Sequence, residues 1–321
     1  MTIQEYFTDK VLLLTGSTGL VGRVLLEKIL YDLPNVRLVY VIIRPKVTRS
    51  GEVISATERF RQDILGSSAF ERLRRREGDG FESLIERKVV PIEGDLSQEC
   101  LGVNADVLKR LQNEVKVIIN CAAVVSFDAS LDVALNLNTL GPLRVLEFAA
   151  GCVDPMVAHV STCYVSGIRE GPVDEEPLDP SNALSGKNVI SDPYDVDREV
   201  AELTRVVRHV EASSRSPWRK MVLSLATHFQ VNGRGSVGTN GAQPSERIRR
   251  EWVEQRLVTE GMRRAKYRGW NDTYTFTKAM GEQMIMRHRG DLPMVIFRPA
   301  IIESAFETPE PGWLDGLRMV D

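Results

Sequence analysis

A glycine-rich turn, placed between an apolar run and an apolar-faced helix, constrains the fold of this chain more than any other feature. The turn follows Val11–Leu14 and precedes Val24–Leu30, an order typical of a buried strand, a tight turn and a helix. Its residues are Thr15, Gly16, Ser17, Thr18, Gly19, Leu20, Val21 and Gly22. Such a turn directs backbone N–H groups and the positive end of a helix at phosphates. A glycine pattern alone also occurs in ordinary turns, but the flanking elements favour dinucleotide binding.

The second predicted strand bears on which dinucleotide is bound. Val39–Ile43 is a parallel-strand candidate, and it is followed by Arg44 and Lys46. Sites selective for NADH usually carry an acidic residue here, which accepts from the ribose 2′-hydroxyl. A cation instead pairs with a 2′-phosphate, so Arg44 favours NADPH. The alternative is that both cations are solvated charges at a strand end.

Composition excludes several classes of protein. The 321 residues suffice for one large α/β domain or two smaller ones. A net charge of −3 argues against nucleic-acid binding. The four cysteines, at positions 100, 121, 152 and 163, have neither metal-site nor disulfide spacing, which predicts no metal and fits a reducing cytoplasm. The sequence contains neither a signal-peptide pattern nor an apolar run of about 20 residues.

Apolar runs alternate with helix-length segments along most of the chain. After the first two, strand candidates are 88–92, 115–120, 156–161 and 294–298, and residues 131–150 have helical periodicity. This alternation predicts an α/β fold: a Rossmann-type, doubly wound parallel sheet. It breaks down between 170 and 268, so a mostly helical insertion is expected between the fifth strand and the last helix.

That insertion divides the chain into three predicted parts. Residues 1–169 form the dinucleotide-binding core, 170–268 a substrate-side lid, and 269–321 the last helix and strand with the start of a substrate region. Within the lid, 192–215 is helical in character, 221–231 is apolar, 232–241 is a glycine-rich loop, and Ser245 caps a further helix. Residues 170–268 could equally be an insertion without function.

The helix after Ser245 is rich in arginine and lysine. A solvated helix face explains this charge most simply. Two sharper hypotheses are contact with the phosphates of a bulky acyl carrier and peripheral contact with an anionic lipid membrane.

A tyrosine and a lysine lie four residues apart, at Tyr274 and Lys278, and therefore on one helix face. A phenol ionises near pH 10 in water, so it donates a proton poorly unless a neighbouring cation stabilises the phenolate. Thr162 follows the strand candidate at 156–161, at the sheet edge where open α/β folds bind ligands. Its hydroxyl could stabilise negative charge developing on a substrate carbonyl. Each feature alone is weak, and their combination with the glycine turn gives them weight.

Taken in order, these motifs resemble the extended short-chain dehydrogenase/reductase superfamily. More narrowly, the chain is similar to the fatty acyl-CoA reductase family, also called male-sterility-type reductases. The segments that carry the resemblance are 15–30, 40–46, 94–96, 120–130, 161–167, 272–278, 298–305 and 310–316, the last being the most specific. Because members of that family continue beyond the Pro-Gly-Trp segment, 269–321 is expected to hold only the start of the substrate region.

The resemblance implies a cofactor-binding set and a catalytic set. The glycines of the turn would approach the pyrophosphate, and Arg44 the 2′-phosphate of NADPH. Asp95 and Leu96 would flank the adenine, Cys121, Ala122 and Ala123 would line the cofactor's path, and Pro299 would lie near the nicotinamide. Thr162, Tyr274 and Lys278 would be catalytic, and Tyr274 and Lys278 would also contact the cofactor.

The activity implied is NADPH-dependent reduction of a long-chain fatty acyl-CoA to a fatty alcohol through an aldehyde. Two alternatives remain at this level. One is another reductase, epimerase or dehydratase of the superfamily, acting on a nucleotide sugar. The other is an NADPH-binding module without catalytic activity.

Overall fold

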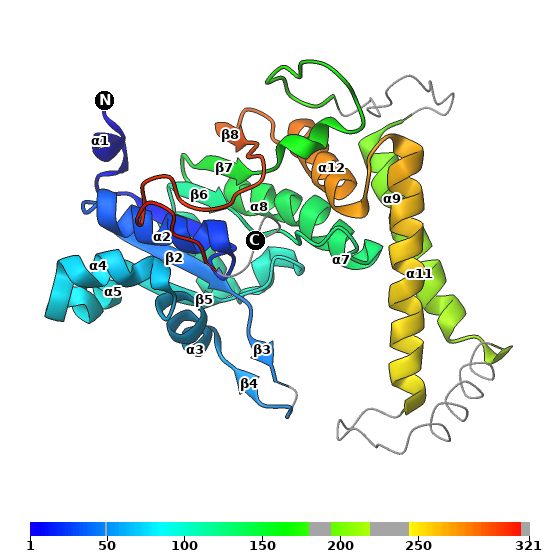
Figure 1. The fold of residues 1–321 in the computed structure, drawn as a ribbon, viewed down its shortest axis with the longest axis horizontal. Coiled ribbons are helices and arrows are strands. Elements are labelled where there is room, and N and C mark those ends of the chain that lie inside the picture. Colours follow the sequence, from blue (N-terminus) through cyan, green and yellow to red (C-terminus); the bar gives the residue numbers. More distant parts are fainter. Residues whose placement is uncertain (49, 180–193, 219–243, 316–321) are drawn as a thin grey trace. The chain divides into compact units, whose positions relative to one another are not determined.

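A six-stranded parallel sheet forms the centre of the fold in the computed structural model, which describes residues 1–48, 50–179, 194–218 and 244–315 (Figure 1). Its strands are β1 (Val11–Thr15), β2 (Leu38–Ile43), β5 (Val89–Glu93), β6 (Val117–Asn120), β7 (Met156–Val160) and β8 (Met294–Phe297). They lie in the order β5-β2-β1-β6-β7-β8, and every neighbouring pair is parallel. The predicted Rossmann-type sheet is therefore confirmed, with all six strands at the expected places.

The strand order reverses between β1 and β6. From β1 the chain first builds outward to β2 and β5, and then returns to add β6, β7 and β8 on the other side. At such a reversal the loops after two adjacent strands diverge, which opens a crevice at their carboxyl ends. The residues that follow β1 and β6 are the glycine turn and Cys121–Ala123.

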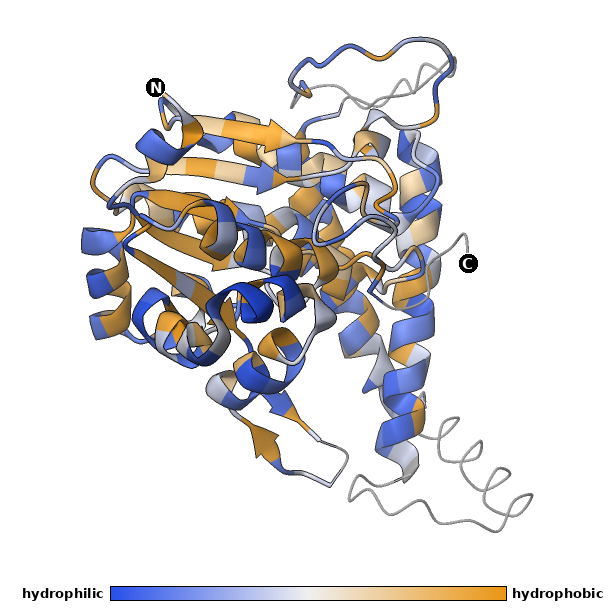
Figure 2. Ribbon diagram, turned by 60° about the vertical axis from the view of Figure 1, so that its left-hand side comes forward, coloured by the Kyte–Doolittle hydropathy of each residue, from blue (hydrophilic) through white to orange (hydrophobic). Residues whose placement is uncertain are grey.

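Helices cover both faces of this sheet. On one face, alternate residues of β1 and β2 such as Leu12, Leu14 and Val41 pack with Leu26 and Phe70 in one buried cluster. The helices on this side are α2 (Leu20–Asp32), α3 (Ala56–Arg59), η1 (Phe60–Leu65), η2 (Ser68–Phe70), α4 (Glu71–Glu77), η3 (Gly78–Gly80) and α5 (Phe81–Lys88). The opposite face is covered by α6 (Ala105–Glu114) and α8 (Leu140–Ala150). Figure 2 shows the hydrophobic strands between these more polar helices.

The chain forms two compact units. The first consists of Met1–Ala123, Leu140–Cys163 and His288–Asp321, and it contains the whole parallel sheet. Its remaining elements are α1 (Ile3–Phe7), η4 (Glu99–Gly102) and a small antiparallel hairpin of β3 (Lys46–Val47) and β4 (Val53–Ile54).

The second unit consists of Val124–Thr139 and Tyr164–Arg287. Its elements are α7 (Leu131–Ala134), η5 (Leu135–Thr139), η6 (Cys163–Ser166), α9 (Val196–Ser214), α11 (Pro244–Arg268) and α12 (Thr273–His288), apart from the end residues Cys163 and His288, which belong to the first unit. The helical insertion and the helix that carries Tyr274 and Lys278 both belong to this unit.

Three details differ from the expectations. The single helix expected over 131–150 is interrupted by a π-helical turn, Leu135–Thr139. The helix expected to be capped by Ser245 begins instead at Pro244, because proline is well tolerated at a first helical position. The hairpin at β3 and β4 was not expected. The apolar stretch 221–231 and the glycine-rich stretch 232–241 lie outside the described residues.

Candidate functional site

The glycine turn lies directly against the loop that follows β6. Gly16 has a φ of +74°, and a Cβ built on it would lie 2.6 Å from the Ala122 nitrogen and 2.6 Å from the Cys121 carbonyl carbon. A Cβ on Gly22 would lie 2.4 Å from the Gly16 carbonyl oxygen. No side chain fits at either position, so glycine is required for both the turn and its contact with the neighbouring loop.

The same turn suits a phosphate ligand. Gly19 is the N-cap of α2 and makes no side-chain cap, and the first helical turn contains no acidic residue. The N–H groups at a helix start lack intrahelical partners, and the helix dipole favours an anion there. The Ser17 hydroxyl is buried, with 1% of the residue exposed, and has no hydrogen-bond partner among the residues that the structure describes. A pyrophosphate oxygen would satisfy it, so the residues present fit the group that the sequence implies.

A hydrogen-bonded row of buried polar side chains links the carboxyl ends of three strands. The Thr15 hydroxyl donates to Asn120 Oδ1 at 2.6 Å, joining β1 to β6 at the strand-order reversal. It also accepts from the Ala122 N–H at 3.3 Å. Asn120 Nδ2 lies 3.1 Å from Nδ1 of His159 on β7. Sequence reasoning selected Thr15 but missed Asn120 and His159 as members of this row; the available signal was a polar residue near the end of each apolar strand.

Arg44 and Asp95 meet beyond the ends of β2 and β5. Their nearest charged atoms are 3.9 Å apart, with 59% of the Arg44 side chain exposed and 16% of that of Asp95. Asp95 also accepts from the Ser97 N–H at 2.8 Å, and the Leu96 carbonyl accepts from Arg144 of α8 at 2.9 Å. An exposed guanidinium in a long ion pair of this kind can exchange its partner for a phosphate.

Thr162 lies at the carboxyl end of β7 and is 4% exposed. The sheet ladder continues past it, because the Ser161 N–H donates to the Phe297 carbonyl at 2.7 Å and the Cys163 N–H to the Pro299 carbonyl at 2.9 Å. Thr162 and Pro299 are therefore brought side by side at one sheet edge. The first unit thus holds the predicted cofactor residues of the sheet together with Thr162.

Tyr274 and Lys278 lie in the first two turns of α12, in the second unit. Asp272 starts this helix, since its carboxylate accepts from the Thr275 N–H at 2.8 Å. Lys278 is 1% exposed. The Tyr274 ring packs edge-on against Phe127, with ring centroids 5.9 Å apart. The convergence of these two side chains with Thr162 stays a prediction.

Asn138 ties the loop before α7 to α12 within the second unit. Its Oδ1 accepts from the Val124 N–H at 2.8 Å, and its Nδ2 donates to the Val124 carbonyl at 3.0 Å and to the Thr277 hydroxyl at 3.2 Å. Thr139 adds a bond from its hydroxyl to the Thr277 carbonyl at 2.8 Å. Both residues end the π-helical turn η5, so this irregular turn sets the backbone next to Lys278.

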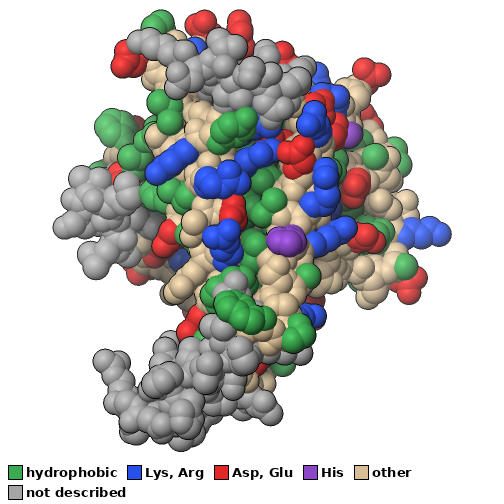
Figure 3. All heavy atoms as spheres, turned by 90° about the vertical axis from the view of Figure 1, so that its right-hand side faces the viewer, with side chains coloured by type: hydrophobic (Ala, Val, Ile, Leu, Met, Phe, Trp, Pro, Cys, Tyr) green, Lys and Arg blue, Asp and Glu red, His purple; other side chains and the backbone are tan. Residues whose placement is uncertain are grey.

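The arginines of α11 are largely engaged in ion pairs. Arg264 and Arg268 both pair with Glu199 of α9, which is 1% exposed, and Arg249 pairs with Glu246 and Glu211. Four more exposed arginines of this helix each pair with a glutamate three or four residues away. These arginines are Arg247, Arg250, Arg256 and Arg263. Figure 3 shows acidic and basic side chains interleaved on this face of the molecule. This pairing reduces the positive charge that the helix can offer to phosphates.

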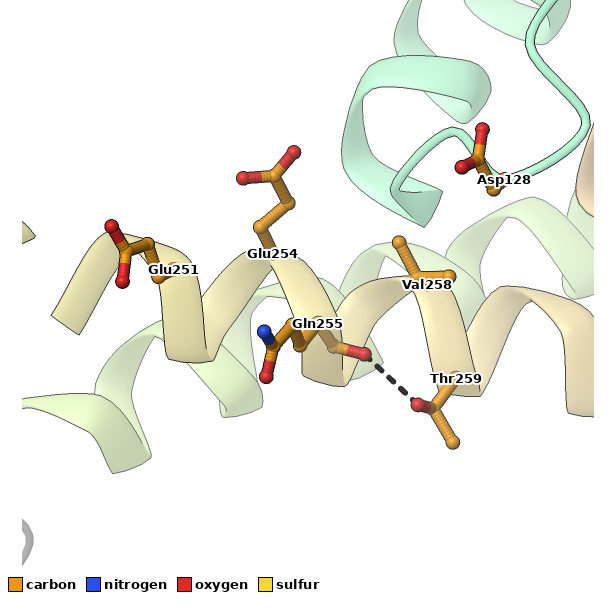
Figure 4. A pocket seen from close by; sticks show the side chains of 6 residues that line it. All are labelled: Asp128, Glu251, Glu254, Gln255, Val258 and Thr259. Carbon is orange, nitrogen blue, oxygen red and sulfur yellow. Dashed lines mark hydrogen bonds between the residues drawn. The ribbon is translucent and has the colours of Figure 1, made fainter. Parts of the chain in front are cut away.

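A pocket of about 480 Å³ lies beside α11, in the second unit (Figure 4). Its lining residues are Asp128, Glu251, Glu254, Gln255, Val258 and Thr259. Three carboxylates repel the phosphates of a dinucleotide or of coenzyme A. None of the sequence-predicted site residues lines this pocket, which is therefore a poor candidate for either ligand.

Comparison with known families shows the family to which the chain belongs. The family model described as "Male sterility protein", an NAD-binding model, matches residues 14–321. The chain belongs to the male sterility protein family. The match includes the glycine turn, Thr162, and the Tyr274 and Lys278 pair, and it confirms the family resemblance found in the sequence. A nicotinamide dinucleotide is the cofactor type that this family assignment supports.

Curated relatives of this male sterility family protein are named fatty acyl-CoA reductases. The chloroplastic fatty acyl-CoA reductase 2 of Arabidopsis thaliana is 34% identical over 99% of this chain and 46% of its own length. The alcohol-forming fatty acyl-CoA reductase of Simmondsia chinensis is 30% identical over 100% of this chain and 57% of its own length. The chain thus spans about half the length of the curated relatives it matches.

Solved structures support the fold of this male sterility family protein. The terminal R domain of the myxalamid biosynthetic pathway is similar with a TM-score of 0.53 and 20% identity, over 92% of this chain and 50% of that one. A thiolation-reductase di-domain from an archaeal non-ribosomal peptide synthetase gives a TM-score of 0.50 and 17% identity, over 95% and 45%. Among the residues that the structure describes, no helix has the length and apolar character needed to cross a membrane.

Proposed function

We propose that this chain binds NADPH and reduces long-chain fatty acyl-CoA to a fatty alcohol by way of an aldehyde. The observation that carries the proposal is the glycine turn at the β1–β6 reversal, in a chain whose family relatives are named fatty acyl-CoA reductases. The turn and the start of α2 would hold the pyrophosphate. The Ser17 hydroxyl and the helix N–H groups are the donors that such an anion needs.

The choice of NADPH over NADH rests on Arg44. Its side chain is 59% exposed at the end of β2, where the ribose 2′ position of a dinucleotide lies in this fold. A 2′-phosphate would replace Asp95 as the ion-pair partner of Arg44, or would bind Arg44 together with Asp95. Asp95 itself accepts from the Ser97 N–H, a bond that would keep this carboxylate in place beside the adenine.

The catalytic roles follow the family resemblance. Bound NADPH would supply one hydride for each of two successive reductions, the first of the thioester and the second of the aldehyde. The Thr162 hydroxyl would donate to the thioester carbonyl oxygen and stabilise the oxyanion formed there. Collapse of this hemithioacetal releases coenzyme A as the thiolate and leaves an aldehyde. In the second reduction Tyr274 would give a proton to the aldehyde oxygen, while the Lys278 ammonium stabilises the resulting phenolate.

The structure supports these roles through the environment of each side chain. Thr162 is fixed by the ladder that joins β7 to the segment after β8. Phe127 packs against the Tyr274 ring, and the Asn138 bonds fix the backbone at Thr277. Reacting groups that are held rigidly lose little entropy when the substrate binds.

An assay of NADPH oxidation against two substrate panels tests this proposal. We expect oxidation with palmitoyl-CoA and a fatty aldehyde or alcohol as product, and no oxidation with nucleotide sugars. A response to nucleotide sugars alone would assign the chain to another branch of the superfamily. NADPH binding without oxidation in either panel would support a module without catalytic activity.

A variant pair separates binding from chemistry. Tyr274→Phe should lower kcat by about a hundredfold or more, as expected for loss of a proton donor, and leave NADPH affinity nearly unchanged. Tyr267→Phe, at a 41% exposed tyrosine of α11 in the same unit, is the matched control and should leave both unchanged. Unaltered turnover by Tyr274→Phe would refute the role given to Tyr274.

A further inference from the structure

The segment after β8 returns across the sheet to α2. Within residues 305–315, here called the return segment, the Gly312 N–H donates to the Ala305 carbonyl at 2.8 Å and the Ala305 N–H to the Trp313 carbonyl at 2.8 Å. Trp313 Nε1 donates to the Ser68 hydroxyl at 3.1 Å, and its ring packs on the core cluster shared with α2. Figure 1 shows this segment in red beside α2. Its position is therefore fixed by packing as well as by hydrogen bonds.

One guanidinium joins the return segment to the glycine turn. Arg23 Nη1 donates to Asp315 Oδ2 at 2.6 Å, and Arg23 Nη2 donates to the Thr18 carbonyl at 2.9 Å. The Arg23 and Asp315 side chains are 16% and 25% exposed. Because the guanidinium is planar and bonded at both ends, it acts as a rigid link between Asp315 and the turn.

A second ion pair in the same region provides a contrast. Glu310 lies 3.6 Å from Arg75 of α4, and the two side chains are 56% and 67% exposed. Solvent screens such a pair, whereas the bond between Arg23 and Asp315 is shorter and mostly shielded from water. Of these two pairs, the one between Arg23 and Asp315 reaches the glycine turn, through the Thr18 carbonyl.

We propose that Asp315 is a positioning residue for the cofactor's pyrophosphate. Through Arg23 it fixes the Thr18 carbonyl, and the N–H of the same peptide, that of Gly19, donates to the Gly16 carbonyl at 3.0 Å. Held at both sides, this peptide would keep the turn in the shape that presents the N–H groups at the start of α2 to the ligand. This inference rests on the proposed cofactor site at the turn, but it is independent of the substrate and of the catalytic residues.

Removing the charge of Asp315 has two opposing effects. The turn loses its fixed carbonyl, which weakens pyrophosphate binding. The Arg23 cation loses its counterion, which would strengthen the attraction of any nearby phosphate. We expect the positioning effect to dominate, because without the Asp315 carboxylate the guanidinium keeps the bond to the Thr18 carbonyl but loses the partner that holds it in that orientation.

Displacement of NADPH by two fragments tests the proposal without turnover. One fragment, 2′-phospho-ADP-ribose, carries both the pyrophosphate and the 2′-phosphate, and the other, 2′-AMP, carries only the 2′-phosphate. For Asp315→Asn we expect about tenfold weaker binding of 2′-phospho-ADP-ribose, which corresponds to about 1.4 kcal/mol, with unchanged binding of 2′-AMP. The matched control Glu310→Gln should change neither value.

Amide hydrogen exchange of the unmodified chain provides a second measurement. Since coupling between two sites is reciprocal, 2′-phospho-ADP-ribose should slow exchange in the return segment, and 2′-AMP should not. If Asp315→Asn weakened the binding of both fragments equally, the effect would be a general structural one and the proposal would be overturned. Unchanged or tighter binding of 2′-phospho-ADP-ribose by this variant would also overturn it. If the unmodified chain bound neither NADPH nor the larger fragment, the proposed function itself would fail.

Discussion

The Thr15 hydroxyl donates to Asn120 Oδ1 at 2.6 Å and thereby joins the two strands between which the sheet changes direction. The same hydroxyl accepts from the Ala122 N–H, so one side chain connects β1, β6 and the loop after β6. Thr15 is 0% exposed and Asn120 is 1% exposed, so the bond between them is buried. The bond holds together the two loops that form the predicted cofactor crevice.

Thr15→Val should destabilise the fold by about 1–3 kcal/mol, because it removes the partner of the buried Asn120 oxygen and of the part-buried Ala122 N–H. Thr15→Ser keeps the hydroxyl and should cost about 1 kcal/mol for the lost methyl group. Urea unfolding measures both. Equal losses in the two variants would show that packing, and not the hydrogen bond, determines the effect.

Gly16→Ala should both destabilise the chain and weaken NADPH binding by about tenfold or more. The added Cβ would meet the Ala122 nitrogen at 2.6 Å, so the turn must move away from β6. Gly51→Ala is the matched control, since Gly51 also has a positive φ, +88°, but no atom of the described part of the chain lies within 4 Å of the added Cβ. It should cost about 1–2 kcal/mol of stability for the backbone strain alone and leave NADPH affinity unchanged.

Most of the sheet could be predicted from the sequence, because its strands are uninterrupted apolar runs and the glycine turn fixes the first strand and helix. The interruption of the 131–150 helix could not be predicted in this way. Its periodicity is helical throughout, and the π-helical turn is determined by distant partners: Asn138 bonds Val124, and Thr139 bonds Thr277. Tertiary hydrogen bonds of this kind leave no local signal.

The residues of the candidate site also divide into those that local sequence patterns predict and those that only tertiary packing brings together. Local patterns identified Gly16, Arg44 and Thr162, because each directly follows a recognisable strand. The bond between Arg23 and Asp315 joins residues 292 positions apart, and neither residue type is unusual at its place in the chain. Only the packing of the return segment on α2 brings them together.

Arg44→Ala should weaken NADPH binding by about tenfold to a hundredfold and leave NADH binding nearly unchanged, since a charge-assisted bond to phosphate contributes about 1.5–3 kcal/mol. Arg61→Ala is a suitable control, because Arg61 is 58% exposed and has a similarly weak ion pair, with Glu82 at 3.3 Å. It should change neither affinity. If Arg44→Ala lowered the affinities for NADPH and NADH equally, the proposal that Arg44 selects NADPH over NADH would be wrong.

Tyr40→Phe should change how stability depends on alkaline pH. Burial, followed by the hydrogen bond to Glu114, raises the pKa of Tyr40 to about 12. The unfolded phenol ionises near pH 10 and the folded one does not, so the native chain loses about 2–3 kcal/mol as the pH rises from about 10 to about 12.

At pH 7 the Tyr40→Phe variant should be less stable by about 0.5–1.5 kcal/mol, because the bond to Glu114 is lost. Its disadvantage should shrink or reverse at pH 11, where the native phenol is penalised. Thermal unfolding at the two pH values measures the difference. A constant difference between the two proteins would contradict the raised pKa.

Transfer of deuterium from the C4 position of the NADPH nicotinamide tests the central claim most directly. The purified chain is incubated with palmitoyl-CoA and with NADPH deuterated on the transferred face, and the product is analysed by mass spectrometry. The account predicts deuterium at C1 of the product, one atom for each hydride delivered, together with release of coenzyme A. A product without deuterium at C1, or intact palmitoyl-CoA with NADPH still bound, would contradict it.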